Sequence, residues 1–239
     1  MVVCQQCSNE YKSISSHWSK NSSCSHPSLT QEQYEIVVGL LMGDGTLHRS
    51  NKNAKIQAQM TTKEYLKYID KKFGKFGNGV TLAHTASEKA TLNKKSGFQQ
   101  DAKEENYSNI YRWRSCGHPE LNQFRSWYET GNKIWPDDID LTPTVLKHWF
   151  CGDGCWSNTN GNNHIQISMA NEIKNREKVD KLFNSSNLPE PSSYAIGKRK
   201  DGSKTCTAQF TVSDSEILWD YMGKPVFGFE YKWPQEYQE

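Results

Sequence analysis

Two Gly-Asp-Gly triplets carry the residues whose chemistry stands out most in this 239-residue chain. Their aspartates are Asp44 and Asp153, and each triplet follows an apolar run that predicts a buried helix. A carboxylate at a helix C-terminus is unfavourable because the helix dipole is negative there. A bound Mg²⁺ would reverse that balance, and it accepts carboxylates, backbone oxygens and waters as ligands. The alternative is that each triplet is an ordinary helix cap followed by a turn.

Other residues repeat at matched distances from the two aspartates. Gln57 and Gln166 each follow their aspartate by 13 residues, and both lie in segments that alternate polar and apolar side chains. Lys133 and Lys232 each precede an aromatic residue and a proline. Two acidic corners brought together in this way could hold metal ions for phosphodiester hydrolysis. A lysine nearby could help to deprotonate the attacking water or stabilise phosphate charge, although either lysine could equally be a solvated residue at a loop start.

The elements that must position these residues follow the same repeat. Thr30 and Gln33 form a capping-box pattern that predicts a helix over 31–42, and a second helix is predicted over about 144–151. Alternation predicts strands over 55–60, 164–169, 111–114 and 209–212, and charged amphipathic helices include 70–73 and 180–183. The polar stretch 85–109 is predicted to be a long loop or a hairpin tip.

These elements predict an α+β fold made of a pseudo-two-fold tandem repeat. The expected unit is helix-strand-strand-helix-strand-strand-helix, and the strands of the two units form two antiparallel sheets. The expected domains are residues 1–29, 30–140 and 141–239.

The polar faces of the predicted strands suit nucleic-acid contact. Arginine and lysine read guanine in the major groove, and glutamine reads adenine. An ordinary solvated sheet face is the alternative. The residues expected to contact DNA are Lys55, Gln57, Gln59, Arg112, Arg114, His164, Gln166, Ser168, Lys198, Lys200 and Gln209.

The first 26 residues are rich in Cys, His and Ser. Cys4 and Cys7 are spaced as a metal knuckle, and His17 and Cys24 are the next ligands, with His26 as a competitor for the fourth place. So short a unit holds too little apolar mass to fold alone, so we expect a structural Zn²⁺.

Composition argues against several other classes of protein. The 7 cysteines form no even framework, which argues against a secreted disulfide-stapled protein. The formal net charge is only +2, so a nucleic-acid partner would depend on local clusters of charge. No apolar run approaches the roughly 20 residues of a membrane-spanning helix, and no signal peptide is apparent. We expect an intracellular protein that does not contact a membrane.

The two triplets and their flanks resemble the LAGLIDADG homing endonucleases of the single-chain, two-repeat kind. The segment Val37–Gly45 fits the family signature, and Leu146–Gly154 fits it as a more divergent second copy. The segment Trp127–Pro136, followed by Leu141–Pro143, resembles the family's lead into its second motif, and Tyr231–Pro234 resembles the family's C-terminal end. The resemblance covers about residues 30–239. Residues 1–26 look like an accessory zinc module that some members carry.

The resemblance implies two saddle-shaped sheets and two motif helices packed face to face. It implies that Asp44 and Asp153 bind Mg²⁺, or Mn²⁺ or Ca²⁺ in the same sites, with backbone help from Gly43 and Gly152. The positions of Lys133 and Lys232 match basic residues that tune the attacking water. Gln57 matches a polar residue that supports the metal site, and Gln166 is assigned that role mainly by the repeat. His148 departs from the small residue expected in the second helix.

The implied activity is site-specific cutting of double-stranded DNA in intron homing. The expected protein is a monomer that binds a long asymmetric DNA site and leaves 3′ overhangs. The main alternative is a maturase that binds intron RNA to assist splicing. A DNA-binding regulator would be expected to have lost one aspartate, and an intein would be expected to end in a His-Asn pair, whereas this chain ends in Tyr-Gln-Glu.

Overall fold

The computed structural model contains two compact units, which are described separately below. The first comprises Met1–Leu29 and Thr46–Gln123, and the second comprises Thr30–Gly45 and Phe124–Glu239. The division of the chain into repeats at residues 30–140 and 141–239 stays a prediction. The structure describes every residue except 5, 13, 21–23, 50, 51, 98–100, 160, 161, 170–175, 199–201, 203 and 239.

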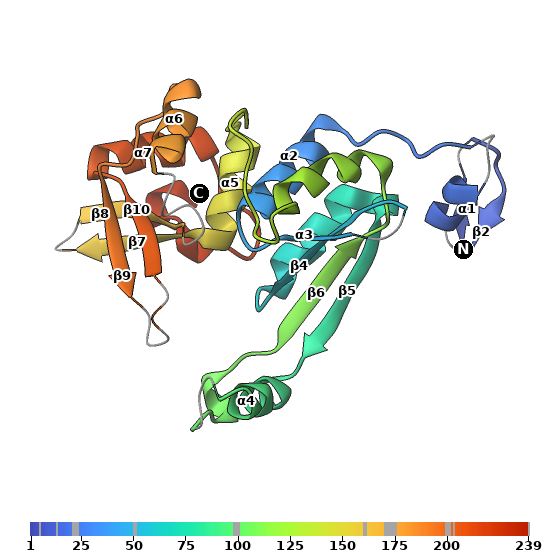
Figure 1. Ribbon diagram of the computed structural model, residues 1–239, viewed down its shortest axis with the longest axis horizontal. Coiled ribbons are helices and arrows are strands. Elements are labelled where there is room, and N and C mark those ends of the chain that lie inside the picture. Colours follow the sequence, from blue (N-terminus) through green and yellow to red (C-terminus); the bar gives the residue numbers. More distant parts are fainter. Residues whose placement is uncertain are drawn as a thin grey trace. The chain divides into compact units, whose positions relative to one another are not determined.

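The first unit is built on a four-stranded antiparallel sheet with the strand order β3-β4-β6-β5 (Figure 1). Its strands are β3 (Thr46–His48), β4 (Lys55–Met60), β5 (Gly77–His84) and β6 (Ile110–Ser115). The strand predicted over 55–60 is confirmed to the residue. Helix α3 (Lys63–Phe73) packs on this sheet and buries its apolar residues, including Tyr65, Leu66 and Ile69.

Alternation along the strands divides the first sheet into two faces. Ile56, Ala58 and Trp113 are fully buried, and they lie on the face that α3 covers. Asp70 of α3 fixes this packing, because its Oδ1 accepts hydrogen bonds from Trp113 Nε1 and from Gly79 N, both at 2.9 Å. The opposite face is left for polar side chains.

The stretch 85–109 is not the plain loop that its polarity predicted. It contains helix α4 (Ala86–Lys95), and Thr85 and Glu88 form a capping box at its start. Figure 1 shows α4 at the far end of the β5–β6 hairpin, so the predicted hairpin tip is correct and its predicted loop conformation is wrong. Thr-x-x-Glu was the sequence signal for this helix.

The second unit repeats the sheet with the strand order β7-β8-β10-β9. Its strands are β7 (Gly154–Thr159), β8 (Asn162–Ser168), β9 (Ser193–Lys198) and β10 (Lys204–Gln209). Each sheet thus follows the same pattern, in which the fourth strand of the repeat pairs between its second and third. The α+β fold class with two antiparallel sheets is confirmed.

The strand predicted over 209–212 is wrong beyond its first residue. β10 ends at Gln209, and Thr211 is the N-cap of helix α7 (Val212–Met222), with its side chain accepting from Asp214 N. A Thr-x-x-Asp capping pattern therefore prevails over the alternation of polar and apolar residues. Helix α6 (Arg176–Ser185) contains the predicted segment 180–183.

Helices α2 (Gln31–Met42) and α5 (Pro143–Asp153) pack against each other within the second unit. The two helices approach closely at Gly39. A Cβ at this position would lie 2.5 Å from the carbonyl oxygen of Val145 and 2.7 Å from the Cβ of His148. His148 thus fits in the second helix because the facing residue of the first helix is glycine. The capping box of Thr30 and Gln33 at the start of α2 is confirmed.

The N-terminal module belongs to the first unit. It consists of a small hairpin, β1 (Val2–Val3) and β2 (Glu10–Tyr11), and the short helix α1 (Ile14–Lys20). The remaining elements are short 3-10 helices at Gly74–Phe76, Glu104–Asn106, Pro119–Tyr128, Glu230–Lys232 and Gln235–Tyr237. The 3-10 segment Pro119–Tyr128 stands where the closing helix of the first repeat was expected.

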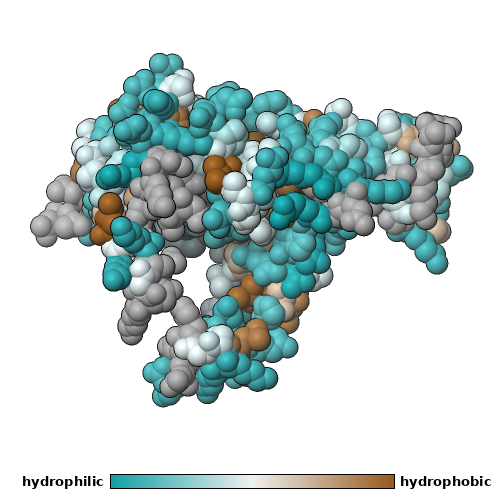
Figure 2. Space-filling model, viewed as in Figure 1, coloured by the Kyte–Doolittle hydropathy of each residue, from teal (hydrophilic) through white to brown (hydrophobic). Residues whose placement is uncertain are grey.

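The face seen in Figure 2 is mostly hydrophilic, which agrees with a mean hydropathy of −0.85. Among the described residues, no helix has both the length and the apolar character needed to cross a membrane.

Candidate active site and metal-binding cluster

Asp44 and Asp153 lie at the C-terminal ends of the paired helices α2 and α5. Asp153 is the last residue of α5, whereas Asp44 lies two residues beyond the end of α2. Glycine brings the two corners together, because a Cβ on Gly152 would lie 2.9 Å from the backbone nitrogen of Asp44 and 3.3 Å from Gly43 Cα. Asp44 is exposed and Asp153 is partly buried.

The two carboxylates influence each other electrostatically. Burial raises the pKa of Asp153 to about 7, and the negative charge of Asp44 acts in the same direction. Lys133 and Lys232 oppose this shift with their positive charges. The site therefore disfavours the charged form of the Asp153 carboxylate, and a divalent cation beside it would favour that form.

Lys133 and Lys232 each contact the helix end of their own repeat. Lys133 Nζ donates to the carbonyl oxygen of Gly43. Lys232 Nζ donates to the carbonyl oxygens of Cys151 at 2.6 Å and Gly154 at 2.7 Å, and lies 3.5 Å from that of Gly152. Burial lowers the pKa of Lys232, and nearby negative groups, including Asp44 and Asp153, oppose that shift. Both ammonium groups thus compensate the negative ends of helices that also carry carboxylates.

Buried tryptophans hold these lysines in place. Trp135 packs edge-on against Trp149 of α5, with ring centroids 5.1 Å apart. Trp233 is fully buried and packs edge-on against Phe150, also at 5.1 Å. Their aromatic-proline motif marked the repeat in the sequence, but their anchoring role was missed because it depends on tertiary contacts with α5.

The donor set at this site suits a divalent cation. Two carboxylates are the usual protein ligands of Mg²⁺, and waters can complete its coordination. The carbonyl oxygens of Gly43 and Gly152 already lie near lysine ammonium groups, but each carbonyl has a second lone pair. The aspartates and lysines predicted from the sequence are therefore brought together in one unit.

The two predicted glutamines occupy matched strands in different units. Gln57 lies on β4 and is buried, with 8% of its surface exposed, and its Oε1 accepts a hydrogen bond from Arg114 Nε. Gln166 lies on β8, where its amide nitrogen is 3.0 Å from His164 Nε2. Their catalytic roles stay predictions.

The residues predicted to contact DNA fall mostly on the polar sheet faces. On the first sheet, register places Gln57 beside Arg114 and Gln59 beside Arg112. On the second sheet, Gln166 lies beside Gln209, and Ser168 lies beside Thr207. Lys55, on β4, is exposed, and His164, on β8, is partly exposed. Strand alternation puts Lys198 on the face opposite to Gln209, and Lys200 lies outside the described residues.

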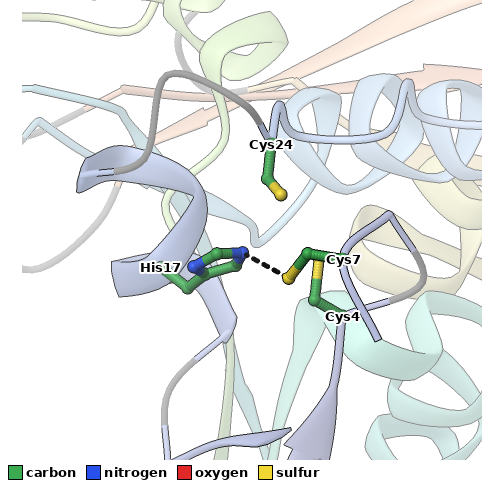
Figure 3. Close-up of side chains that lie close together, drawn as sticks. All are labelled: Cys4, Cys7, His17 and Cys24. Atoms are coloured by element: carbon green, nitrogen blue, oxygen red, sulfur yellow. Dashed lines mark hydrogen bonds between the residues drawn. The ribbon is translucent and has the colours of Figure 1, made fainter. Parts of the chain in front are cut away.

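A second cluster lies in the N-terminal module. The ligand atoms of Cys4, Cys7, His17 and Cys24 all lie within 4.8 Å of one another (Figure 3). Cys7 Sγ lies 3.6 Å from His17 Nε2. Cys24 therefore completes the group, and His26 does not take part in it. His26 instead lies beside Trp18 and His118, at centroid distances of 5.4 and 5.3 Å.

The thiols of this cluster suit a cation. Burial acts to raise the pKa of Cys4, but backbone N–H groups of Cys7 and Gln6 outweigh it and bring the pKa to about 6. Burial, with Cys7 and Cys4 close by, raises the pKa of Cys24 to about 11. A zinc ion bonds sulfur at about 2.3 Å in a tetrahedron, which places ligand atoms roughly 3.8 Å apart. The four ligands would need to close by only about an ångström.

The similarity to one solved structure, a homing endonuclease, shows a shared fold. The homing endonuclease I-WcaI bound to its DNA recognition sequence matches with a TM-score of 0.64 and 17% identity, over 87% of this chain and 88% of that chain. The N-terminal LAGLIDADG domain of WhiA matches with a TM-score of 0.43 and 11% identity, over 83% and 85%. I-DmoI in complex with DNA and Mn matches with a TM-score of 0.41 and 12% identity, over 80% and 96%.

No curated protein matches the chain. The model of the LAGLIDADG DNA endonuclease family matches residues 34–188, which include both triplets, most of α2, all of α5, the first sheet, and strands β7 and β8 of the second sheet. That match extends over more than half of the chain, and the protein therefore belongs to the LAGLIDADG DNA endonuclease family.

Proposed function

We propose that this protein is a site-specific endonuclease that cuts both strands of a DNA duplex with divalent cations held by Asp44 and Asp153. The observation that carries the proposal is the meeting of the two aspartates at the ends of α2 and α5, where burial and mutual repulsion raise the pKa of Asp153 to about 7. Membership of a DNA endonuclease family supports the same activity and does not favour the maturase alternative.

In this proposal, the bound cation, Mg²⁺ or a substitute such as Mn²⁺ or Ca²⁺, would lower the pKa of a water and stabilise the leaving oxygen. The protein's own residues perform the positioning. Asp44 and Asp153 each contribute a carboxylate, and the backbone oxygens of Gly43 and Gly152 lie beside them. Lys133 and Lys232 keep positive charge next to the carboxylates and attract the scissile phosphate. Gln57 and Gln166 are proposed to support these groups.

The proposed substrate is a long asymmetric duplex read by the polar faces of the two sheets. The proposed product is a double-strand break with 3′ overhangs, made by a monomer in which each repeat contributes one aspartate. We also propose that Cys4, Cys7, His17 and Cys24 hold a structural Zn²⁺, because their ligand atoms form a compact group and three of the four residues are buried.

The test is selection of cleaved sites from a genomic or random DNA library with Mg²⁺. We expect Asp44→Asn and Asp153→Asn each to lower double-strand cleavage at least a thousandfold, because loss of one carboxylate removes a metal ligand. DNA binding in Ca²⁺ should persist. Asp220→Asn, at an exposed carboxylate of α7, is the matched control and should cut normally. Double-strand cutting by either active-site variant would contradict the proposal.

A further inference from the structure

A cavity opens on the polar face of the first sheet. It has a volume of about 190 Å³ and is lined by Asn78, Gly79, Thr81, Arg112 and Arg114. A shift of register in β5 between Gly77 and Val80 lies beside it. A bulge of this kind re-aims side chains and ends regular pairing, which explains why an otherwise continuous strand leaves space here.

The two arginines give this cavity its chemistry. Arg114 lies directly beside Gln57 on the neighbouring strand, and its Nε donates to Gln57 Oε1. This bond leaves the two terminal nitrogens of the guanidinium for a ligand. Arg112 lies between Gln59 and Thr81, and its Nε is buried with no hydrogen-bond partner among the described residues.

The positive charge at this cavity is not neutralised locally. Within the described part of the chain, neither Arg112 nor Arg114 forms an ion pair with a carboxylate. The one amide in the lining is already engaged, because Asn78 Nδ2 donates to the carbonyl oxygen of Ser115 and its Oδ1 accepts from Cys116 Sγ. The cavity therefore suits a ligand with two adjacent hydrogen-bond acceptors, because the N–H groups of a guanidinium can donate to both at once.

Two groups of a DNA duplex offer such a pair, which are the O6 and N7 atoms of guanine and the oxygens of a phosphate. The guanidinium of Arg114 is held in the middle of the sheet by a neighbouring side chain, and this suits a contact of fixed geometry with one base. We propose that Arg114, oriented by Gln57, and Arg112 read guanines in the half of the DNA target that the first sheet contacts. This inference rests on the proposed function, since it assumes a DNA substrate.

The second sheet provides an internal comparison. At the position matching Gln57 and Arg114, it pairs Gln166 with Gln209, and at the position matching Gln59 and Arg112, it pairs Ser168 with Thr207. These rows of the second sheet carry amides and hydroxyls but no guanidinium. The two halves of the target should therefore differ, with a guanine requirement in the half read by the first sheet and an adenine preference opposite Gln209.

The experiment is sequence selection by binding with the full chain in Ca²⁺, followed by a separate cleavage assay in Mg²⁺. We expect Arg114→Gln to lose the preference for guanine at one position of one half-site, by about tenfold or more. Arg114→Lys keeps the charge and loses the fork, so it should also weaken this preference. The reciprocal variant, Gln209→Arg, should gain a preference for guanine in the other half-site.

Each outcome decides the matter. The inference would be supported if Arg114→Gln lost the preference for guanine in one half-site and Gln209→Arg gained such a preference in the other. A fall in affinity that is uniform across sequences, with a shallower salt dependence, would mean a phosphate contact and would overturn it. An unchanged guanine preference, or a wild-type protein that selects no sequence, would also overturn it. Failure to cut a selected site in Mg²⁺ would count against the proposed nuclease while leaving the base preference intact. Thermal unfolding of each variant checks that it is folded.

Discussion

Asp44 and Asp153 occupy the same place in two matched triplets, yet their surroundings differ. Asp153 ends helix α5 and is partly buried, whereas Asp44 lies beyond the end of α2 and is exposed. Burial, helped by the charge of Asp44, raises the pKa of Asp153 to about 7. A carboxylate in that position is protonated more readily than an ordinary aspartate, so protons would compete with the proposed cation for it.

The pH dependence of stability follows from this shift. In metal-free protein the folded-state pKa of Asp153 lies above its ordinary value. Its contribution to stability is therefore complete below about pH 4 and is lost as the pH rises through about 7. We expect the loss to be roughly 1–2 kcal/mol, since partial exposure screens the charge.

The measurement is thermal unfolding between pH 5.5 and 8.5 in EDTA. The melting temperature of the wild-type protein should fall across this range relative to that of Asp153→Asn, and added Mg²⁺ should remove the difference. Parallel pH profiles for the two proteins in EDTA would show that Asp153 does not titrate in this window.

At the scale of elements, the pairing of α2 with α5 depends on glycine. A Cβ on Gly39 would lie 2.5 Å from a backbone oxygen of α5, which no small adjustment of a side chain relieves. A Cβ on Gly43 would meet its nearest atoms at 3.4 Å, which is ordinary contact. Gly39, inside α2, therefore has a much stricter packing requirement than Gly43, which caps the same helix.

These distances predict different costs for the same substitution. Gly39→Ala should lower the free energy of unfolding by about 1–3 kcal/mol, because it forces the two helices apart. Gly43→Ala should change it by less than about 1 kcal/mol. Chemical denaturation of both variants gives the comparison, and equal stabilities would show that the helices do not pack as closely as described.

At the scale of the whole molecule, the N-terminal module packs against the sheet-bearing part of the first unit, Thr46–Gln123. Trp18 contacts Phe76, with ring centroids 5.7 Å apart, and Phe76 in turn packs edge-on against His118 at 5.0 Å. His118 also lies 2.9 Å from the carbonyl oxygen of Pro27 through its Nε2. The module is therefore an integral part of the first unit, and an ion that orders the module should stabilise that unit.

This packing predicts that loss of the zinc and loss of the Trp18 contact affect the protein differently. Cys4→Ser should lose about one zinc ion per chain and lower the melting temperature, whereas Cys155→Ser, at an exposed cysteine outside the cluster, should keep the zinc. Trp18→Ala should keep the zinc but lower the melting temperature, because it removes a large buried side chain. Metal analysis and thermal unfolding are the readouts, and unchanged zinc in Cys4→Ser would remove the assignment.

Much of the fold was predictable because its signals are local. Apolar periodicity and the cap at Thr30 determine α2, and polar alternation determines β4 to the residue. The matched offsets of Gln57 and Gln166 indicated the repeat, and the common strand order of the two sheets agrees with it. Where two local signals competed, at Thr85 and Thr211, a helix cap prevailed over polarity and over alternation.

The sequence by itself determined which residues are proposed to carry the chemistry: two aspartates, two lysines and a Cys/His set, each marked by residue type and spacing. Only the tertiary structure decided what surrounds them. It brought Lys232 onto the carbonyl oxygens at the end of α5, grouped Cys24 rather than His26 with Cys4, and opened a cavity beside Arg112 and Arg114. Such outcomes depend on contacts between residues far apart in the chain, and local spacing does not encode those contacts.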